Sequence, residues 1–236
     1  MIPDGRIRAS AIALDLDGTL LDTIHDLAAA INALLAEMGH APLPKDAIRA
    51  LVGKGMANLV QRALALARGV PAAAIDAATR DGALSRYQAH YAAILGRGTL
   101  PFPGMVEGLD ALRAMGFPLA IVTNKASRFV QPHLDHAGIA HHFSLVIGGD
   151  TLPTRKPDPG PLQHVARAFG ITPARLLMVG DSGNDVQAAR AAGCPVLVLP
   201  YGYNEGEPVQ NLRADGIVPT LRAVVDRVRF VAADLT

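Results

Sequence analysis

The chain has 236 residues, of which 50% are hydrophobic, enough to bury one large core or a core with a small second domain. Lysine and arginine together number 22, against 21 aspartates and glutamates, so no strong net charge recruits nucleic acid or an anionic membrane. The single cysteine, Cys194, excludes an intrachain disulfide and a zinc site built from several thiolates of one chain.

The sequence also gives an expectation about location. No stretch approaches the length of a membrane span, and residues 1–6 lack the apolar core of a signal peptide. We therefore expect a cytoplasmic protein without a membrane or nucleic-acid partner. Both a monomer and a homodimer remain open, because apolar surface for dimerisation cannot be separated from core by pattern alone.

The first strong chemical signal follows the apolar run 11–14, where residues 15–19 read DLDGT. A strand that ends in carboxylates presents them at its carboxyl edge, where open parallel sheets bind ligands. Because side chains alternate along an extended segment, Asp15 and Asp17 face the same way. Two anions so close repel each other unless a cation such as Mg²⁺ lies between them. An ordinary surface turn is the alternative, since Asp-Gly is also a common turn pair.

From Asp22 to about Gly96 the sequence is alanine-rich and helical in its apolar period, without a strand pattern. Gly53, Lys54 and Gly55 interrupt two of these helical patterns. Flanking glycines allow a ligand to approach the backbone closely, and a lysine there has the charge to pair with a second anionic group of a substrate. The segment is not a Walker loop, which needs serine or threonine directly after the lysine. A helix-to-helix turn with an exposed lysine is the alternative.

From about residue 98 onward, the pattern changes to alternating strands and helices. The apolar runs predict strands at 118–123, 145–149, 176–180 and 195–199. This alternation predicts an α/β fold with a doubly wound, Rossmann-like parallel sheet and helices on both faces.

These two patterns predict two domains. We expect a Rossmann-like catalytic core of residues 1–21 and 99–236, with residues 22–98 inserted as an all-helical cap. The second connection, residues 96–104, is rich in glycine and proline, which suits a hinge and equally a plain loop.

Polar residues also follow the later strands. Thr123 and Asn124 end the strand at 118–122, and Asp181 and Asp185 follow the strand at 176–179, while Lys156 lies in a proline-stiffened loop between them. The carboxyl ends of parallel strands share one edge, so these groups are expected near the first acidic pair. Each residue also has a structural alternative, as a helix cap, a solvated lysine or an acid favoured by a helix dipole.

Two other segments carry weaker signals. His133, His136, His141 and His142 cluster in sequence, but none is joined to a strand-end carboxylate, so solvated or capping histidines are favoured over a zinc site. Residues 201–207 are interpreted as a loop near the site, followed by a last helix.

In chain order, the acidic pair, the hydroxyl with an amide, the lysine and the second acidic pair resemble the four motifs of the haloacid dehalogenase-like hydrolase superfamily, over about residues 11–185. The resemblance implies a phosphohydrolase whose helical cap opens and closes over the site. Dehalogenase members lack a carboxylate at the position of Asp17, so its presence favours phosphoryl transfer over carbon-halogen cleavage.

The resemblance also assigns roles. It implies that Asp15 is the nucleophile and forms an aspartyl-phosphate, and that Asp17 protonates the leaving alkoxide and then deprotonates the attacking water. The implied cofactor is Mg²⁺, held by the Asp15 carboxylate, the Asp17 main-chain carbonyl and Asp181. Asp185 is expected behind these ligands, where it orients a water or Lys156.

For the phosphate group, the resemblance implies Thr123 and Asn124 as hydrogen-bond donors, and Lys156 as the positive charge that accompanies transfer to Asp15. Gly53, Lys54 and Gly55 are the candidate substrate-selecting residues of the cap.

The choice of substrate depends on the cap. Residues 22–30, 52–55 and 59–64 are most similar to bacterial phosphoglycolate phosphatases, which implies hydrolysis of 2-phosphoglycolate to glycolate and phosphate. Alternatives are a phosphatase for another small sugar or sugar-acid phosphate, a phosphonoacetaldehyde hydrolase with Lys54 as Schiff base, a phosphohexose mutase, and a non-catalytic phosphate-binding module. In each case the expected partner is a small phosphorylated metabolite.

Overall fold

The structure of the protein, a computed structural model, describes residues 5–232. The predictions made for residues 1–4 and 233–236, as ends of the core domain, lie outside this range. Within the described range, none of the helices is long and apolar enough to cross a membrane.

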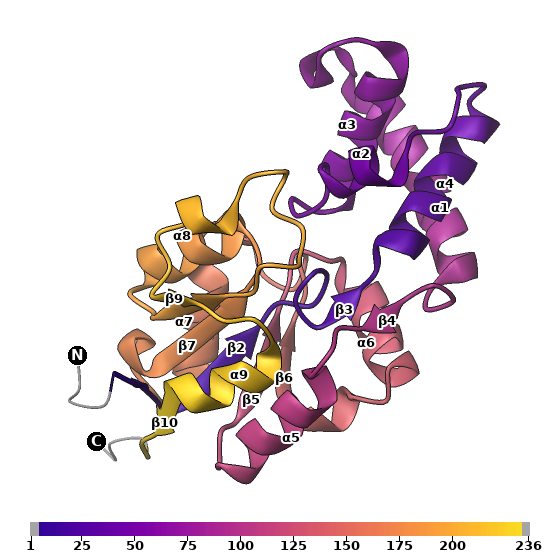
Figure 1. Cartoon of the computed structure of the whole chain (residues 1–236). Helices are drawn as coiled ribbons and strands as arrows, with labels where there is room; N and C mark the ends of the chain where they lie inside the picture. Colours follow the sequence, from indigo (N-terminus) through magenta and orange to yellow (C-terminus); the bar gives the residue numbers. More distant parts are fainter. Residues whose placement is uncertain (1–4, 233–236) are drawn as a thin grey trace.

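The architecture is a six-stranded parallel sheet with helices on both faces, which confirms the predicted α/β class (Figure 1). In spatial order the strands are β6 (Phe143–Ile147), β5 (Leu119–Val122), β2 (Ala11–Leu14), β7 (Leu176–Gly180), β8 (Val196–Val198) and β9 (Gly216–Ile217). After β2, the chain adds β5 and β6 on one side of it and then crosses to add β7, β8 and β9 on the other side. Such a reversal of strand order marks the point where open α/β sheets bind ligands.

Two hydrophobic layers hold helices to this sheet. On one face, α5 (Met105–Ala114), α6 (Ser127–His136) and α9 (Leu221–Val224) pack on the sheet, and on the other face lie α7 (Gly160–Ala168) and α8 (Gly183–Ala192). The residues of β2 are all buried, as expected for a central parallel strand covered on both sides.

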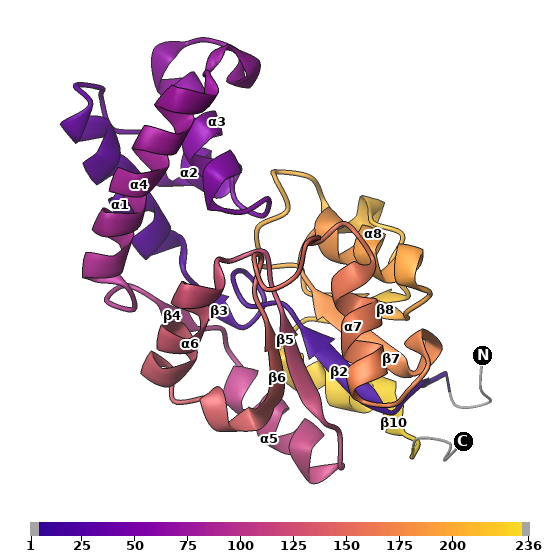
Figure 2. The same ribbon diagram turned by 180° about the vertical axis from the view of Figure 1, so that it is seen from behind.

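Four helices form a separate body beyond one end of the sheet (Figures 1 and 2). They are α1 (Ile24–Glu37), α2 (Lys45–Arg49), α3 (Met56–Arg68) and α4 (Ala77–Ile94). Their apolar side chains make a hydrophobic cluster of their own, with Phe129 and Tyr203 as its contributions from the sheet-bearing part. We call this four-helix body the cap.

The remaining elements are short. A parallel pair joins β1 (Ile7–Ala9) to β10 (Val228–Phe230), and an antiparallel pair joins β3 (Leu21–Asp22) to β4 (Leu100–Pro101). Turns of 3₁₀ helix lie at Ala72–Ala74, Ala140–His142, Pro173–Arg175, Val209–Asn211 and Val225–Arg227. The sequence did not predict the two strand pairs or β9, and residues after 207 contain β9 and β10 as well as the expected last helix.

The second connection to the cap is tied to α1 by one buried carboxylate. Asp26 is 3% exposed and accepts hydrogen bonds from the backbone N–H groups of Gly96, at 2.8 Å, and Gly98, at 2.7 Å. The Thr99 hydroxyl donates a third bond at 2.8 Å. The glycine-rich connection is therefore anchored at its cap end.

Replacing Asp26 with alanine should lower the free energy of unfolding by about 3 kcal/mol, since three donors lose a charged acceptor in a buried place. Chemical denaturation measures this loss. Asp81→Ala is the matched control, because the Asp81 side chain is 61% exposed and its removal should change stability by no more than about 0.5 kcal/mol. Equal effects of both substitutions would contradict the anchoring role of Asp26.

Candidate active site

The strand register brings the predicted site residues to one edge of the sheet. Leu14 of β2 pairs with Ile121 of β5 on one side and with Val179 of β7 on the other. The residues that follow these strands therefore meet at the same level, and among them are Asp15 and Asp181. The cap lies over this edge.

Three carboxylates gather here around one lysine. Oxygen atoms of Asp15, Asp181 and Asp185 all lie within 4.8 Å of one another, and this is the one group of acidic, histidine or cysteine side chains in residues 5–232 with the spacing to hold a metal ion. The Lys156 Nζ lies 3.0 Å from Asp15 Oδ2 and 2.6 Å from Asp185 Oδ1. The structure thus brings together four residues from three separate segments of the sequence.

The pKa values of this cluster reflect an excess of buried negative charge. Burial raises the pKa of Asp15 to about 6, against the opposing effect of Lys156. Burial, with Asp185 and Asp15 nearby, raises the pKa of Asp181 well above its ordinary value. Burial would lower the pKa of Lys156, but Asp15 and Asp185 outweigh it and raise that pKa. One ammonium group does not balance three carboxylates, so a bound cation would stabilise the site.

Asp185 also has a structural role. It closes a capping box at the start of α8, where its Oδ2 accepts from the backbone N–H of Ser182 at 3.0 Å and of Asp181 at 3.1 Å. With its other oxygen on Lys156, this carboxylate fixes both the lysine and the segment that carries Asp181.

Glycine is required where the chain passes these carboxylates. Gly18 has φ of +88°, and a Cβ on it would collide with the Asp181 carboxylate. The Asp181 Oδ1 accepts from the Thr19 hydroxyl at 2.6 Å and its Oδ2 from the Tyr203 backbone N–H at 2.6 Å. The backbone approaches Asp181 this closely because Gly18 carries no side chain.

Thr123 and Asn124 follow β5 and face different partners. The Thr123 hydroxyl oxygen accepts from the Lys125 N–H at 3.3 Å, which leaves the hydroxyl proton to donate into the cavity. The Asn124 Nδ2 donates to the carbonyl oxygens of Lys156, at 2.8 Å, and Gly53, at 2.9 Å. Asn124 therefore links the lysine-bearing loop to the cap, and both of its amide protons are already used.

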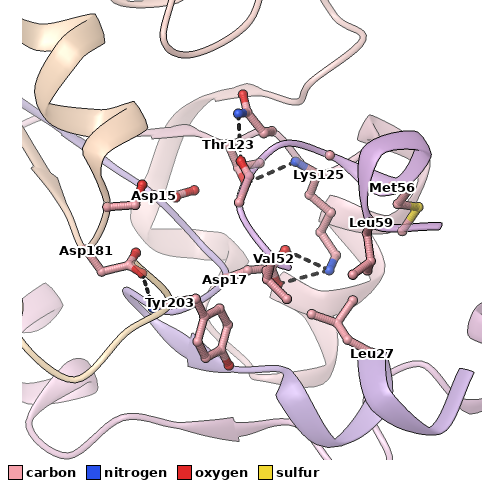
Figure 3. Close-up of a pocket in the computed structure, with 14 residues that line it drawn as sticks. Asp15, Asp17, Leu27, Val52, Met56, Leu59, Thr123, Lys125, Asp181 and Tyr203 are labelled. Carbon is pink, nitrogen blue, oxygen red and sulfur yellow. Dashed lines mark hydrogen bonds and ion pairs between the residues drawn. The ribbon is translucent and has the colours of Figure 1, made fainter. Parts of the chain in front are cut away.

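Asp17 does not join the carboxylate cluster. Its side chain turns toward Lys125, whose Nζ lies 3.0 Å from Asp17 Oδ1 and 3.1 Å from Oδ2 (Figure 3). Burial would raise the pKa of Asp17, but Lys125 outweighs it and holds that pKa below its ordinary value. No role was predicted for Lys125 from the sequence, although its position directly after Thr123 and Asn124 was a signal.

A pocket lies between this edge of the sheet and the cap (Figure 3). It contains about 520 Å³ of space between atoms, part of which is open to solvent. Polar residues at the edge of the sheet and mostly apolar residues of the cap line it: Asp15, Asp17, Leu27, Val52, Gly53, Gly55, Met56, Leu59, Thr123, Asn124, Lys125, Asp181, Ser182 and Tyr203.

The residues of the cap loop, 53–55, contact two different cavities. Gly53 and Gly55 line the pocket between the sheet edge and the cap, whereas Lys54 lines a neighbouring groove. The Lys54 Nζ lies 2.7 Å from Glu205 Oε2. Arg62 of α3 also pairs with Glu205. In this arrangement the charge of Lys54 is used by a core carboxylate, and the side chain is 46% exposed.

The loop after β8 reaches the cap through a second contact. Tyr203, which is 2% exposed, places its hydroxyl oxygen 2.8 Å from the Thr23 N–H and 3.0 Å from the Ile24 N–H, and donates to Asp22 Oδ1 at 2.5 Å. The expected position of this loop near the site agrees with the lining role of Tyr203.

The histidines divide into two kinds. His136 and His141 are exposed, but His133 and His142 are buried, at 1% and 4% exposure, so the expectation of solvated side chains is wrong for these two. His142 lies 2.9 Å from Asp110 Oδ1, and His133 lies against Tyr91 of α4. Helix packing buries them, which sequence spacing does not reveal.

Comparison with known proteins gives two findings on sequence. A family model of the haloacid dehalogenase-like hydrolases matches residues 9–193. The phosphoglycolate phosphatase of Thiobacillus denitrificans is 48% identical over 211 residues, which cover 89% of this chain and 92% of that protein. The phosphoglycolate phosphatase of Nitrosospira multiformis is 49% identical with the same coverage of both chains.

Solved structures agree in fold. A crystal structure described as a predicted phosphoglycolate phosphatase from Haemophilus somnus superposes with a TM-score of 0.86 and 34% identity, covering 92% of this chain and 96% of that one. CbbY from Rhodobacter sphaeroides, in complex with phosphate, superposes with a TM-score of 0.74 at 22% identity over 91% and 95% of the two chains, which supports the fold alone.

Proposed function

Because this chain belongs to the haloacid dehalogenase-like hydrolases, we propose that it is a Mg²⁺-dependent phosphatase of small phosphate monoesters, with 2-phosphoglycolate as its substrate. The observation that carries the proposal is the buried set of Asp15, Asp181, Asp185 and Lys156 at the switch point of the sheet, next to the pocket under the cap. This set has the nucleophile, the cation ligands and the lysine that phosphoryl transfer needs.

The residues present fit a magnesium ion. Three buried carboxylates with oxygens within 4.8 Å offer hard ligands, and their charge exceeds that of Lys156. We propose that Asp15, Asp181 and the main-chain carbonyl of Asp17 hold the ion, with Asp185 behind them on Lys156. When bound, Mg²⁺ neutralises charge on the phosphate oxygens.

The chain's own residues then divide the chemistry. Asp15 attacks the phosphorus, so that an Asp15 O–P bond forms while the P–O bond to the leaving alkoxide breaks. The Leu16 N–H, at 2.7 Å, and Lys156 orient the two Asp15 oxygens. Lys156 supplies a positive charge next to Asp15 as the phosphoryl group moves to that residue. Thr123 donates its free hydroxyl proton to a phosphate oxygen. Asp17 must first take up a proton against the effect of Lys125 on its pKa; it then gives that proton to the leaving alkoxide, and its carboxylate later takes a proton from the attacking water.

The role proposed for Asn124 changes with its contacts. Its amide protons are held by Gly53 and Lys156, so direct donation to phosphate requires one of these bonds to open. We propose that Asn124 acts with Thr123 on phosphate when the cap loop moves, and that it holds the Lys156 loop in place otherwise.

Substrate choice is proposed to lie with the cap loop. Gly53 and Gly55 leave room on the cap side of the pocket. Lys54 would release Glu205 and bind the substrate carboxylate in its place. The named function of curated relatives at 48% and 49% identity supports 2-phosphoglycolate. The predicted domain limits, the cytoplasmic location and the choice between monomer and homodimer remain predictions from the sequence.

Replacing Lys54 with alanine should raise KM for 2-phosphoglycolate by about 5-fold, as expected for loss of a partly exposed ion pair, and change KM for p-nitrophenyl phosphate little. Initial rates on the two substrates measure this difference. Lys45→Ala, a change of an exposed lysine on α2, is the control. Equal changes in both KM values would remove Lys54 from substrate selection.

The proposed function is tested by phosphate release from 2-phosphoglycolate, sugar phosphates, nucleotides and phosphonoacetaldehyde, with Mg²⁺ and with chelator. We expect a preference for 2-phosphoglycolate that chelation abolishes. Preference for another ester would keep the mechanism and change the substrate, and interconversion of sugar phosphates would indicate a mutase. Absence of turnover with all of these compounds would contradict the proposal and favour a phosphate-binding module.

A further inference from the structure

Lys125 carries a buried ammonium group that the mechanism so far does not use. Its side chain is 1% exposed, and its Nζ contacts both oxygens of Asp17, at 3.0 and 3.1 Å. The third contact is the Tyr91 hydroxyl oxygen at 2.6 Å. The ammonium group therefore has two partner groups, the Asp17 carboxylate and the Tyr91 hydroxyl.

Tyr91 in turn is fixed by its surroundings. It lies on α4 of the cap, is fully buried, and its hydroxyl lies 3.0 Å from His133 Nε2 on α6 of the core. Its ring stacks on His133 with centroids 6.0 Å apart and an interplanar angle of 17°. The Lys125 Nζ also lies 4.9 Å from the Tyr91 ring centroid, a favourable position for a cation.

Burying an ammonium group is expensive unless its partners are arranged for it. Here the partners come from three elements: the segment after β2, the cap helix α4 and, through Tyr91, the core helix α6. Contact with both oxygens keeps the buried Asp17 carboxylate turned toward the Lys125 ammonium group.

We propose that Lys125 is a positioning residue for Asp17, which holds that carboxylate at the leaving-group side of the site, with Tyr91 and His133 holding Lys125. This inference rests on the proposed phosphatase function and on the role of Asp17 in it. Lys125 is not assigned to the substrate, because its Nζ is already held by the Asp17 carboxylate and the Tyr91 hydroxyl.

The test compares wild-type protein and Lys125→Met on three esters. 2-Phosphoglycolate has an alkyl leaving group and a carboxylate, glycerol 3-phosphate has an alkyl leaving group without one, and p-nitrophenyl phosphate has a leaving group that departs without protonation. General acid catalysis contributes about 10² to 10⁴-fold, and misplacement of such a group by about 1 Å can cost about 10²-fold. We expect kcat to fall about 100-fold on both alkyl esters and less than about 5-fold on the aryl ester.

A second comparison tests whether Lys125 acts through Asp17. In the Asp17→Asn background, adding Lys125→Met should lower kcat on the alkyl esters by less than about 3-fold, because residues that act as a unit are not additive. Tyr91→Phe keeps both Lys125 and Asp17 and should show the same dependence on leaving group with a smaller loss. This variant keeps the test valid if Lys125→Met does not fold.

Arg128→Met is the matched control, since Arg128 is an exposed cation three positions along the chain whose guanidinium lies over the Phe129 ring. It should leave kcat on all three esters unchanged. Thermal unfolding of each variant checks the fold.

The inference is overturned if Lys125→Met lowers kcat equally on alkyl and aryl esters, which indicates a structural role. A loss confined to 2-phosphoglycolate also overturns it, because Lys125 would then bind the substrate carboxylate. If Asp17→Asn itself shows no dependence on the leaving group, the proposed function of Asp17 fails instead.

Discussion

Replacement of Asp15 by asparagine is expected to lower kcat by about 10⁴-fold or more, because the amide cannot attack phosphorus and form the covalent intermediate. The substitution keeps the size of the side chain, and the amide oxygen of asparagine can still accept the hydrogen bond that the Leu16 N–H donates to Asp15 Oδ1. Steady-state phosphate release measures the loss, and circular dichroism with thermal unfolding checks the fold.

The matched control for this substitution is Asp22→Asn. Asp22 is another carboxylate near the cap connection, but it accepts from the Tyr203 hydroxyl and lies outside the cavity lining. We expect its kcat to fall far less than that of Asp15→Asn. Turnover of Asp15→Asn near the wild-type rate would exclude Asp15 as the nucleophile.

Replacement of Lys156 by methionine is expected to have the second largest effect, on both activity and stability. Its side chain is 1% exposed and it contacts Asp15 and Asp185, so its removal leaves buried carboxylates without their cation. Breaking a buried ion pair in this way costs about 3 to 5 kcal/mol. We expect this loss in the metal-free protein, together with a fall in kcat of about 10³-fold, as found for loss of a group that stabilises transition-state charge.

Chemical denaturation with chelator, at a mildly alkaline pH above the Asp15 pKa of about 6, measures the stability loss. Lys54→Met is the control, because the Lys54 side chain is 46% exposed and its pair with Glu205 is a surface interaction worth about 1 kcal/mol at most. If Lys156→Met unfolded at the same denaturant concentration as wild type, the lysine would not be needed to balance the acid cluster.

The parts of the fold that the sequence predicted are those with a local signal. The apolar runs that became β2, β5 and β7 are short and end in polar residues, and the run that became β8 is short and ends at Pro200. Such patterns need no knowledge of distant partners. The strands that were missed depend on distant partners. Ile7 pairs with Val228, and Leu21 pairs with Pro101. These segments are only two or three residues long, too short to show a strand pattern of their own.

The candidate site divides in the same way. Asp15, Asp181 and Lys156 could be placed together because each follows a strand end, or a loop beside one, on the same edge of the sheet. The partners of long side chains could not be predicted. Lys125 extends to Asp17 and Tyr91, and Lys54 turns to Glu205, and these choices depend on how the cap sits on the core.

The most direct test of the central claim is to identify the phosphorylated residue during turnover. The protein is mixed with 2-phosphoglycolate and Mg²⁺, quenched in acid, and treated with borohydride, which reduces an acyl phosphate to an alcohol, before peptide mapping by mass spectrometry. The account predicts conversion of Asp15 to homoserine, in the wild-type protein and not after chelation. Full turnover with Asp15 unmodified and another residue trapped, or with no trapped residue, would contradict it.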